Sequence, residues 1–206
     1  MRRLRSADYV RTRWKNDGGW TTEIARDPAS SDDPGLEEFR WRVSIAEIER
    51  DGAFSAFPGV DRDLLLLSGN GIELDIGDAE PVRLDQRFQR VRFAGEDAVH
   101  CRLLAGPTRD FNVMVRRGVI EAETLARPLT GSMLIFAEPH TRWLIHVCAG
   151  HAAVRDEAEQ VAADAGDTLI SDMRETGRVV IEGAGEIVLV RLREVDAMPN
   201  THVVTE

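Results

Sequence analysis

Apolar and polar residues alternate in short runs along almost the whole chain, and glycine, proline and aspartate separate the runs. A period of two is typical of strands with one buried and one polar face, whereas the period of an amphipathic helix is scarce here. The pattern predicts strands over 20–26, 39–48, 63–68, 71–76, 81–84, 88–93, 99–105, 110–117, 132–136, 143–148, 152–155, 160–163, 168–171, 178–182 and 186–193. So many short strands at this spacing predict an all-β sandwich or barrel.

Turn-forming residues place the connections between these strands. The run Ser-Gly-Asn-Gly at 68–71 predicts a hairpin, because its residues tolerate the positive φ of tight turns. Glycines at 166 and at 183–185 predict similar turns late in the chain. The segment 27–38 is rich in Ser, Asp, Pro and Gly and predicts an exposed loop.

The strand pattern loses its regularity over 116–131, where Pro128 interrupts it. About half a dozen short strands lie on each side of this seam, and the symmetry predicts two stacked β-barrel units. We expect the first barrel to span 1–118 and the second to span 119–195. Residues 196–206 carry little pattern and are expected to form a C-terminal tail.

The composition is that of an ordinary globular chain with an acidic balance. The 206 residues include 43% hydrophobic and 30% charged residues, and the formal net charge is −10. The chain lacks the basic stripe that phosphate backbones require, so we expect no nucleic-acid partner. No apolar run approaches the roughly 20 residues of a membrane helix, and the charged N-terminus has no signal core. We therefore expect a cytoplasmic protein with no membrane partner.

Neither a metal centre nor a nucleophile is predicted from the motifs. No His-x-His pair occurs among the five histidines, which are His100, His140, His146, His151 and His202. No Asp or Glu at a companion spacing completes a ligand set. Cys101 and Cys148 have no CxxC spacing and are expected to be small buried hydrophobes. Without a nucleophile elbow or a phosphate-binding loop, we expect no catalytic residue, no metal and no cofactor.

Three predicted strands each combine a bulky apolar face with a face of small and polar side chains. In 39–48, one face carries Phe39, Trp41, Val43 and Ile45, and the other carries Arg40, Arg42, Ser44 and Ala46. In 20–26, Thr21, Glu23 and Ala25 lie opposite Trp20, Thr22 and Ile24. In 110–116, Asp110, Asn112, Met114 and Arg116 lie opposite Phe111, Val113 and Val115. The polar faces are either wetted by solvent or line the mouth of a barrel, and their small side chains favour a pocket.

Cationic side chains near these polar faces favour a site for a small anion. Lys15 is the only lysine among 26 basic residues, and it lies between two tryptophans and before a glycine pair. Arg42 shares its face with a serine, and Arg62 follows a tight turn. Together with Asn16, these residues suit charge-assisted hydrogen bonds to a carboxylate.

Other interpretations of these residues stay open. A salt bridge from Arg62 to Asp61 or Asp63 is the simpler explanation for that arginine. Lys15 and Glu23 are also candidates for an acid–base pair, which would require burial to lower the pKa of the lysine.

Five motifs, in order along the chain, resemble those of the HutD/Ves family. They are Trp14-Lys15-Asn16-x-Gly18-Gly19, Thr22-Glu23-Ile24, Trp41-Arg42-x-Ser44-x-Ala46, Gly52-x-Phe54-Ser55-x-Phe57-Pro58-Gly59-Val60-Asp61-Arg62 and Arg109-Asp110-Phe111-Asn112-Val113-Met114. The match runs from about residue 12 to 118, and the second half matches only in its general strand pattern. The family commonly has a third glycine where this chain has Asp17, so an extra carboxylate stands beside Lys15.

The resemblance implies a bicupin, with two stacked cupin-type β-barrels in one chain. It also implies a regulatory role in histidine utilisation, in which the protein binds a small carboxylate intermediate, formylglutamate or urocanate, without turning it over. The motif positions carried over are Lys15, Asn16, Gly18, Gly19, Glu23, Arg42, Ser44, Arg62, Asp110 and Asn112. The expected ligand-binding residues are Lys15, Asn16, Thr21, Glu23, Arg42, Ser44, Arg62 and Asn112.

Two other functions remain as alternatives. One is a metal-independent cupin enzyme that acts on a small anionic substrate, and the other is an interaction module that uses an exposed β face. The sequence holds no decisive signal for or against a homodimer.

Overall fold

The computed structural model describes residues 1–28, 39–155, 159–173 and 177–195. These residues form sixteen strands and one short 3-10 helix, η1 (Ser6–Asp8), and contain no α-helix, so the predicted all-β class is confirmed. Most of the predicted 27–38 loop and the predicted 196–206 tail lie outside the described residues. No helix in the described part of the chain has the length and apolar character needed to cross a membrane.

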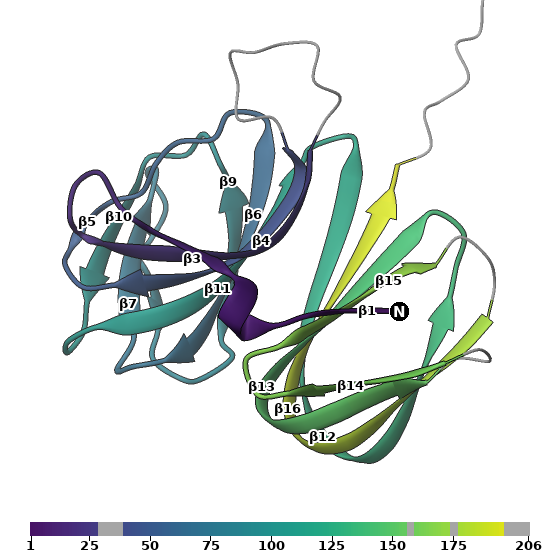
Figure 1. Cartoon of the computed structure of the whole chain (residues 1–206). Coiled ribbons are helices and arrows are strands. Elements are labelled where there is room, and N and C mark those ends of the chain that lie inside the picture. Colours follow the sequence, from purple (N-terminus) through teal and green to yellow (C-terminus); the bar gives the residue numbers. More distant parts are fainter. Residues whose placement is uncertain (29–38, 156–158, 174–176, 196–206) are drawn as a thin grey trace, which may run out of the picture.

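The strands form three antiparallel sheets (Figure 1). The pocket sheet has the order β2 (Val10–Arg13), β3 (Gly19–Pro28), β4 (Phe39–Ile48), β11 (Thr108–Arg116), β6 (Val60–Ser68) and β9 (Arg90–Ala94). The cover sheet has the order β5 (Gly52–Ala53), β10 (Val99–Leu103), β7 (Ile72–Ile76) and β8 (Val82–Leu84). The C-terminal sheet has the order β1 (Arg2–Leu4), β15 (Thr168–Met173), β13 (Thr141–Arg155), β16 (Gly177–Glu194) and β12 (Ile120–Ala137), with β14 (Gln160–Asp164) also paired to β13.

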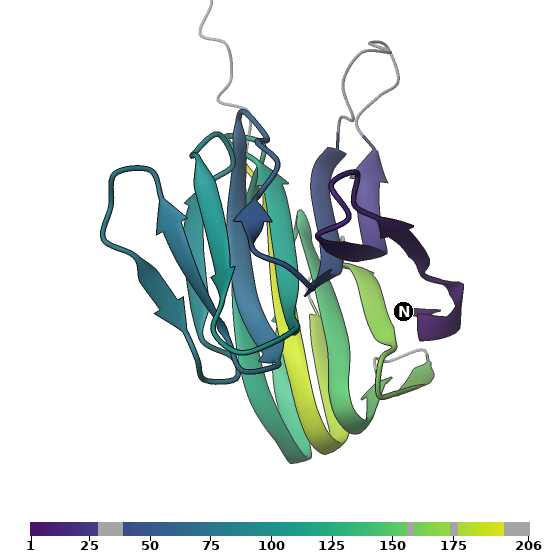
Figure 2. The same ribbon diagram turned by 90° about the vertical axis from the view of Figure 1, so that its left-hand side faces the viewer.

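Apolar side chains fill both sides of the pocket sheet. One cluster lies between the pocket sheet and the cover sheet and includes Leu64, Leu74 and Cys101. A larger cluster lies on the opposite face and joins the pocket sheet to the C-terminal sheet, with Phe111 and Val190 among its members. Figure 2 shows these layers from the side. A third cluster lies within the C-terminal sheet, whose long strands bend around it. The pocket sheet is therefore the central layer of the molecule.

The hydrogen-bond ladders do not close barrels. Among the described strands, β2 and β9 are edges of the pocket sheet, β5 and β8 are edges of the cover sheet, and β1 and β12 are edges of the C-terminal sheet. The first unit is therefore two sheets packed face to face rather than a continuous ring of strands. The expectation of two barrels is not confirmed by this hydrogen bonding.

The predicted seam over 116–131 is wrong in its second part, because β12 continues through Pro128 as a regular strand. The carbonyl oxygens of Ala122 and Thr124 point away from β16 and accept hydrogen bonds from arginines of β9. Pro128 lies an even number of residues from Ala122 and Thr124 on this edge strand, so its backbone also faces away from β16. Its missing N–H therefore removes no hydrogen bond from the β12–β16 ladder.

Two predicted turns also differ from the structure. The 68–71 run does not join a hairpin, because β6 belongs to the pocket sheet and β7 to the cover sheet. Residues 183–185 lie inside β16, where this strand pairs with β13. Gly185 has a φ of 140°, and a Cβ there would lie 1.9 Å from the carbonyl oxygen of Ala149. Here glycine permits a close approach of two strands, not a turn.

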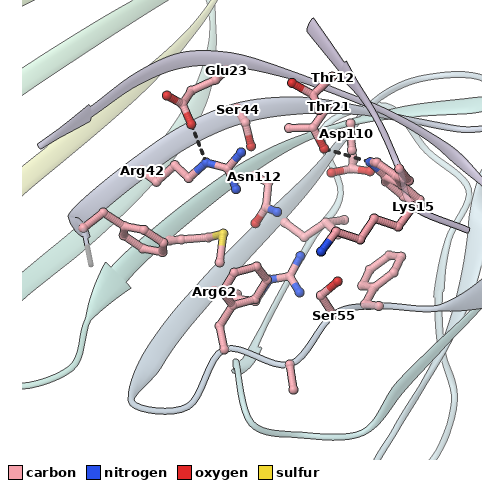
Figure 3. A pocket seen from close by; sticks show the side chains of 18 of the residues that line it. Thr12, Lys15, Thr21, Glu23, Arg42, Ser44, Ser55, Arg62, Asp110 and Asn112 are labelled. Carbon is pink, nitrogen blue, oxygen red and sulfur yellow. Dashed lines mark hydrogen bonds and ion pairs between the residues drawn. The ribbon is translucent and has the colours of Figure 1, made fainter. Parts of the chain in front are cut away.

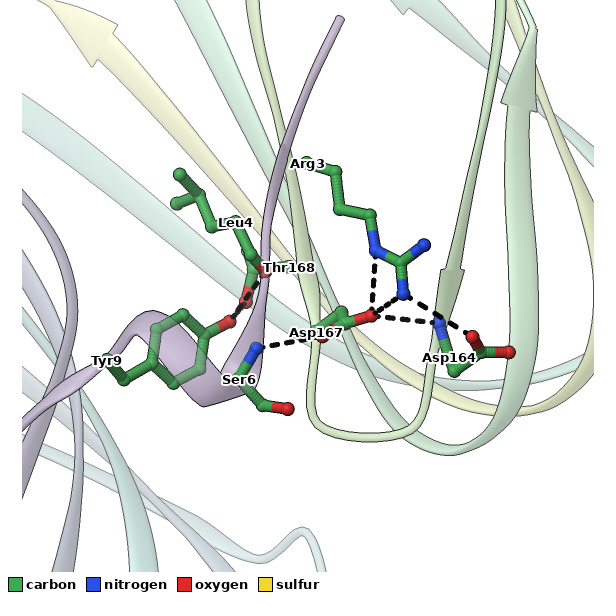
Figure 4. Close-up of polar contacts among 7 residues, drawn as sticks. All are labelled: Arg3, Leu4, Ser6, Tyr9, Asp164, Asp167 and Thr168. Atoms are coloured by element: carbon green, nitrogen blue, oxygen red, sulfur yellow. Dashed lines mark hydrogen bonds and ion pairs between the residues drawn. The ribbon is translucent and has the colours of Figure 1, made fainter.

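The N-terminal segment crosses to the C-terminal sheet, where β1 pairs with β15. Asp167 holds this segment, since Oδ1 accepts a hydrogen bond from the backbone N–H of Ser6 at 2.8 Å and Oδ2 accepts from Arg3 Nε at 2.9 Å (Figure 4). The Tyr9 hydroxyl donates to Thr168 Oγ1 at 2.8 Å. The strand pattern did not predict β1, β2 or β5, which are only two to four residues long.

We expect Phe111→Ala to destabilise the protein strongly, because Phe111 is 0% exposed in the apolar cluster that joins the pocket sheet to the C-terminal sheet. Removing a buried phenylalanine side chain costs about 3–5 kcal/mol. Urea denaturation measures this loss, and Val10→Ala is the control because Val10 is 67% exposed. A Phe111→Ala loss no larger than that of Val10→Ala would contradict the assigned core.

Candidate functional site

A cavity of about 670 Å³ opens between the pocket sheet and the segment that follows β5 (Figure 3). It is lined by Thr12, Arg13, Trp14, Lys15, Asn16, Thr21, Glu23, Arg26, Phe39, Arg42, Ser44, Ala46, Ala53, Phe54, Ser55, Ala56, Phe57, Arg62, Leu64, Asp110, Asn112 and Met114. All eight residues expected to bind a ligand line this one cavity. The size and the mixture of apolar and polar side chains suit a small molecule.

Strand register arranges the floor of the pocket in rows. Met114 of β11 pairs with Arg42 on one side and with Arg62 on the other. In the next row, Asn112 pairs with Ser44. Because neighbouring strands lie about 4.8 Å apart, the backbones that carry the two arginines are separated by about 10 Å. The cations therefore flank a central strand that supplies a thioether and an amide.

The turn that carries Lys15 is held on both sides. The Trp14 N–H donates to the carbonyl of Gly19 at 3.0 Å, and the Asn16 Oδ1 atom accepts from the Gly18 N–H at 3.0 Å. A Cβ on Gly19 would lie 2.2 Å from the carbonyl oxygen of Glu47, so only glycine fits this approach. Figure 3 shows the Lys15 side chain extending from this turn into the pocket.

Asp17 does not neutralise Lys15. Its carboxylate lies 3.3 Å from Arg13 Nε, and its carbonyl oxygen accepts a hydrogen bond from Arg13 Nη2 at 2.7 Å. The φ of Asp17 is 56°, in the left-handed region that favours glycine. This backbone conformation explains why the resembling motif has glycine at this position. Lys15 has no ion pair with any residue in the described ranges.

Trp14 forms one wall of the pocket. Its indole Nε1 donates a hydrogen bond to Thr21 Oγ1 at 2.8 Å, and its ring meets that of Phe54 edge-on at 6.4 Å. These contacts fix the tryptophan beside the aromatic segment that covers the pocket. The Thr21 hydroxyl is oriented by the same hydrogen bond.

Arg62 is buried and forms no salt bridge to Asp61 or Asp63, so the simpler explanation for this residue is wrong. Strand alternation places both aspartates on the opposite face, where Asp61 pairs with Arg117 at 2.7 Å. Asp63 lies near Arg90 at 3.7 Å. In the described part of the chain, no carboxylate lies within ion-pair distance of Arg62.

Aromatic rings surround the Arg62 guanidinium instead. Its Cζ lies 5.3 Å from the ring centre of Phe54, 5.7 Å from that of Phe57 and 4.9 Å from that of Phe93. Its Nε is buried without a hydrogen-bond partner. Burial lowers the pKa of Arg62 to about 10, Asp110 acts in the opposite direction, and Arg42 lowers it further. Arg62 therefore remains charged at neutral pH without a close counter-ion.

Arg42 and Glu23 form an ion pair across β3 and β4. Arg42 Nε donates to Glu23 Oε2 at 2.8 Å, and Arg26 Nε lies 3.6 Å from Glu23 Oε1. Glu23 therefore holds two arginines at one side of the pocket. It pairs with these arginines rather than with Lys15, which does not support the proposed acid–base pair.

β-Bulges change which side chains reach the pocket. The register shifts between Glu23 and Ala25, so Ala25 packs on the apolar face and Arg26 lines the pocket. The prediction that Ala25 shares a face with Glu23 is wrong. Phe39 likewise lies at the pocket with Met114 instead of beside Trp41. A bulge leaves no clear mark on the alternating pattern, so the sequence did not reveal Arg26.

Asp110 also lines the pocket and was carried over as a motif position, but it is absent from the expected ligand-binding set. It is 1% exposed, and neither carboxylate oxygen has a hydrogen-bond partner. Burial raises the pKa of Asp110 to about 7, and the positive charge of Arg62 acts in the opposite direction. Its motif and its place on the polar face of β11 were the signals available in the sequence.

None of the four histidines in the described residues, His100, His140, His146 and His151, lines the pocket. His146 is 3% exposed, its Nδ1 lies 2.9 Å from Thr168 Oγ1, and its ring packs near Phe111. Burial lowers the pKa of His146 to about 4. Among the described residues, no group of three or more His, Cys, Asp or Glu is arranged to hold a metal ion.

Comparison with known proteins identifies the relatives of this chain. A family model described as HutD matches residues 6–189. An uncharacterized 21.2 kDa protein in the hutC 3′ region of Pseudomonas putida is 46% identical over 54% of this chain and 56% of its own length. Protein Ves of Escherichia fergusonii is 39% identical over 50% of this chain and 51% of its own length. The chain thus spans about half the length of the curated relatives it matches.

Solved structures share the fold over nearly the whole chain. HutD from Pseudomonas fluorescens SBW25, in a formate condition, is 32% identical, with a TM-score of 0.79 over 94% of this chain and 98% of that chain. The structure described as "Putative Glyoxylate Induced Protein" from Pseudomonas aeruginosa is 14% identical, with a TM-score of 0.69 over 95% of this chain and 88% of that chain, and this likeness shows only a shared cupin-like fold. The family match also extends beyond the five motifs into the second half. The resemblance drawn from those motifs is confirmed, and the chain belongs to the HutD family.

Proposed function

We propose that this protein is a non-enzymatic regulatory protein that binds a small carboxylate intermediate of histidine degradation, formylglutamate or urocanate, in the pocket of the first unit. Membership of the HutD family gives the association with histidine utilisation. The observation that carries the proposal is the buried Arg62, whose charge has no close counter-ion in the described structure. A buried charge is costly unless it is paired, so a ligand carboxylate is the natural partner.

The charge of the pocket supports an anionic ligand. Five basic residues, Arg13, Lys15, Arg26, Arg42 and Arg62, line it, against two acidic residues, Glu23 and Asp110. This excess of positive charge lies in a chain whose formal net charge is −10. An acidic protein needs such a local basic site to hold an anion.

The aromatic and apolar lining supports a ligand with a short carbon body. Trp14, Phe54, Phe57 and Met114 surround the space between the cations. Binding sites for small molecules combine such apolar walls with a few polar groups that fix orientation. A small carboxylate with several carbon atoms would use both parts of this lining.

The proposal includes a bicupin architecture and a cytoplasmic location. The pocket and cover sheets would form the first cupin-type unit, and the C-terminal sheet around its own apolar cluster would form the second. Cys101 and Cys148 are free thiols. Free thiols are usual in a reducing compartment.

One observation favours a metal-independent enzyme as the second candidate. Asp110 lies at the pocket with a pKa of about 7, which suits a group that gives and takes a proton near neutral pH. A small anionic substrate held at Arg62 would lie in the same cavity. This candidate uses Asp110 rather than the Lys15–Glu23 pair.

Arg62→Met tests the binding proposal, because methionine keeps apolar packing against the phenylalanines and removes the charge. We expect formylglutamate or urocanate to raise the Tm of the wild-type protein by binding the native state. The variant should bind about 10- to 100-fold more weakly, since hydrogen bonds to charged groups contribute about 1.5–3 kcal/mol. Thermal shift and calorimetry measure both effects.

Arg83→Ala is the matched control, because this arginine is exposed on the cover sheet and pairs with Asp85 outside the pocket. It should leave the Tm shift unchanged. The proposal fails if neither compound shifts the Tm, or if the Arg62→Met variant binds as tightly as the wild type.

Incubation with ligand distinguishes the two candidate functions. NMR spectra of formylglutamate and of urocanate, each kept with stoichiometric protein for a day, should show the compound unchanged if the protein only binds it. New product signals that disappear in the Asp110→Asn variant would instead establish the enzyme.

A further inference from the structure

Asp110 has an environment that does not suit a permanent carboxylate ion. It lines the pocket from β11, where its strand neighbours are Ala46 of β4 and Leu66 of β6. Neither oxygen receives a hydrogen bond from any group in the described structure. A buried carboxylate without donors is strongly disfavoured relative to the neutral acid. Asp110 therefore holds a proton more readily than an ordinary aspartate.

Few ionisable groups face Asp110 from the surrounding strands. Arg62 of β6 is the cation that acts on it directly, and Arg42 of β4 in turn acts on Arg62. Cys101 of β10 faces it from the cover sheet, and Asp51 acts on that thiol. Burial raises the pKa of Cys101 to about 12, so the thiol stays neutral between pH 5 and 9. The charge of Arg62 is thus the main influence that stabilises an ionised Asp110.

A ligand carboxylate at Arg62 would remove this influence. Its negative charge would offset the guanidinium charge that Asp110 experiences and would add repulsion inside a poorly solvated cavity. Two carboxylates that share one cation in a low-dielectric site favour the uptake of a proton by one of them. Burial already raises the pKa of Asp110 to about 7, well above that of an ordinary carboxylic acid, so the proton goes to Asp110.

We propose that Asp110 is a positioning residue that couples anion binding to the uptake of one proton, so that the pocket holds its carboxylate ligand more tightly as the pH falls. This proposal deepens the proposed function and rests on it, because it concerns the same pocket. The consequence is a sensor whose response depends on both the ligand concentration and the pH.

The direction of the effect follows from the linkage of proton and ligand. Below a pH of about 7, Asp110 is already protonated in the free protein, and the Kd should not change with pH. Above it, Asp110 must take up a proton each time a ligand binds, so the Kd should rise by up to about tenfold per pH unit. If the ligand keeps Asp110 protonated throughout, the Kd rises about 30-fold between pH 6 and pH 8.5.

Isothermal titration calorimetry with N-formyl-L-glutamate tests the coupling. Both carboxyl groups of this probe are ionised over the whole range, so the probe adds no titration of its own. Measurements at pH 8 in two buffers with different ionisation enthalpies should give an uptake of about one proton, which should fall towards zero at pH 5.5.

Asp110→Asn provides a readout that a merely structural role would not give. Asparagine has nearly the shape of the protonated acid and carries no charge, so the variant should bind independently of pH, with the affinity of the wild type at low pH. Asp63→Asn is the matched control, since Asp63 is also buried but faces Arg90 and Arg92 on the opposite side of the sheet. It should keep the wild-type pH dependence.

The outcomes separate this inference from the proposed function. If N-formyl-L-glutamate and urocanate do not bind at any pH, the proposed function itself fails. If N-formyl-L-glutamate binds with a Kd that is constant from pH 6 to pH 8.5, or without proton uptake at pH 8, only the coupling is overturned. If Asp110→Asn does not fold, the calorimetry of the wild-type protein in two buffers still decides the question.

Discussion

The apolar contact between the pocket sheet and the C-terminal sheet is the interaction on which the pocket depends. Trp41 and Val43 of β4 and Phe111 and Val113 of β11 are buried in this contact. Because successive side chains on a strand point to opposite faces, burial of this set forces the intervening residues onto the other face. On that face, some of the intervening side chains pack against the cover sheet and the others line the cavity. A shift of one residue in the register would exchange the two sets.

The same packing explains how an uncompensated charge is tolerated. Arg62 lies among three phenylalanine rings, and its guanidinium gains some stabilisation from their faces. That contribution does not equal a hydrogen-bonded ion pair, and a buried cation without one costs stability. The large apolar clusters on both faces of the pocket sheet offset this cost. The fold therefore keeps at its cavity a buried cation that lowers stability, as proteins often do at positions that are not selected for maximal stability.

The alternation of side chains made the main features predictable from the sequence. It gave the all-β class, most of the strands and the polar face that carries Arg42, Ser44 and Asn112. It failed for Arg26 and Phe39, because register shifts at bulges depend on tertiary packing and not on local pattern. The pairing of β1 with β15 was equally out of reach, since three residues pair with a strand more than 160 positions away. The unpaired state of Arg62 required the structure, because neighbouring aspartates in the sequence suggested the opposite.

The position of a bound carboxylate tests the central claim most directly. A crystal structure of the protein with N-formyl-L-glutamate should show a carboxylate group of the ligand within hydrogen-bond distance of the Arg62 guanidinium, inside the cavity beside Asn112 and Met114. Ligand density at another site with this cavity empty would contradict the account, as would a ligand in the cavity whose carboxylates avoid Arg62.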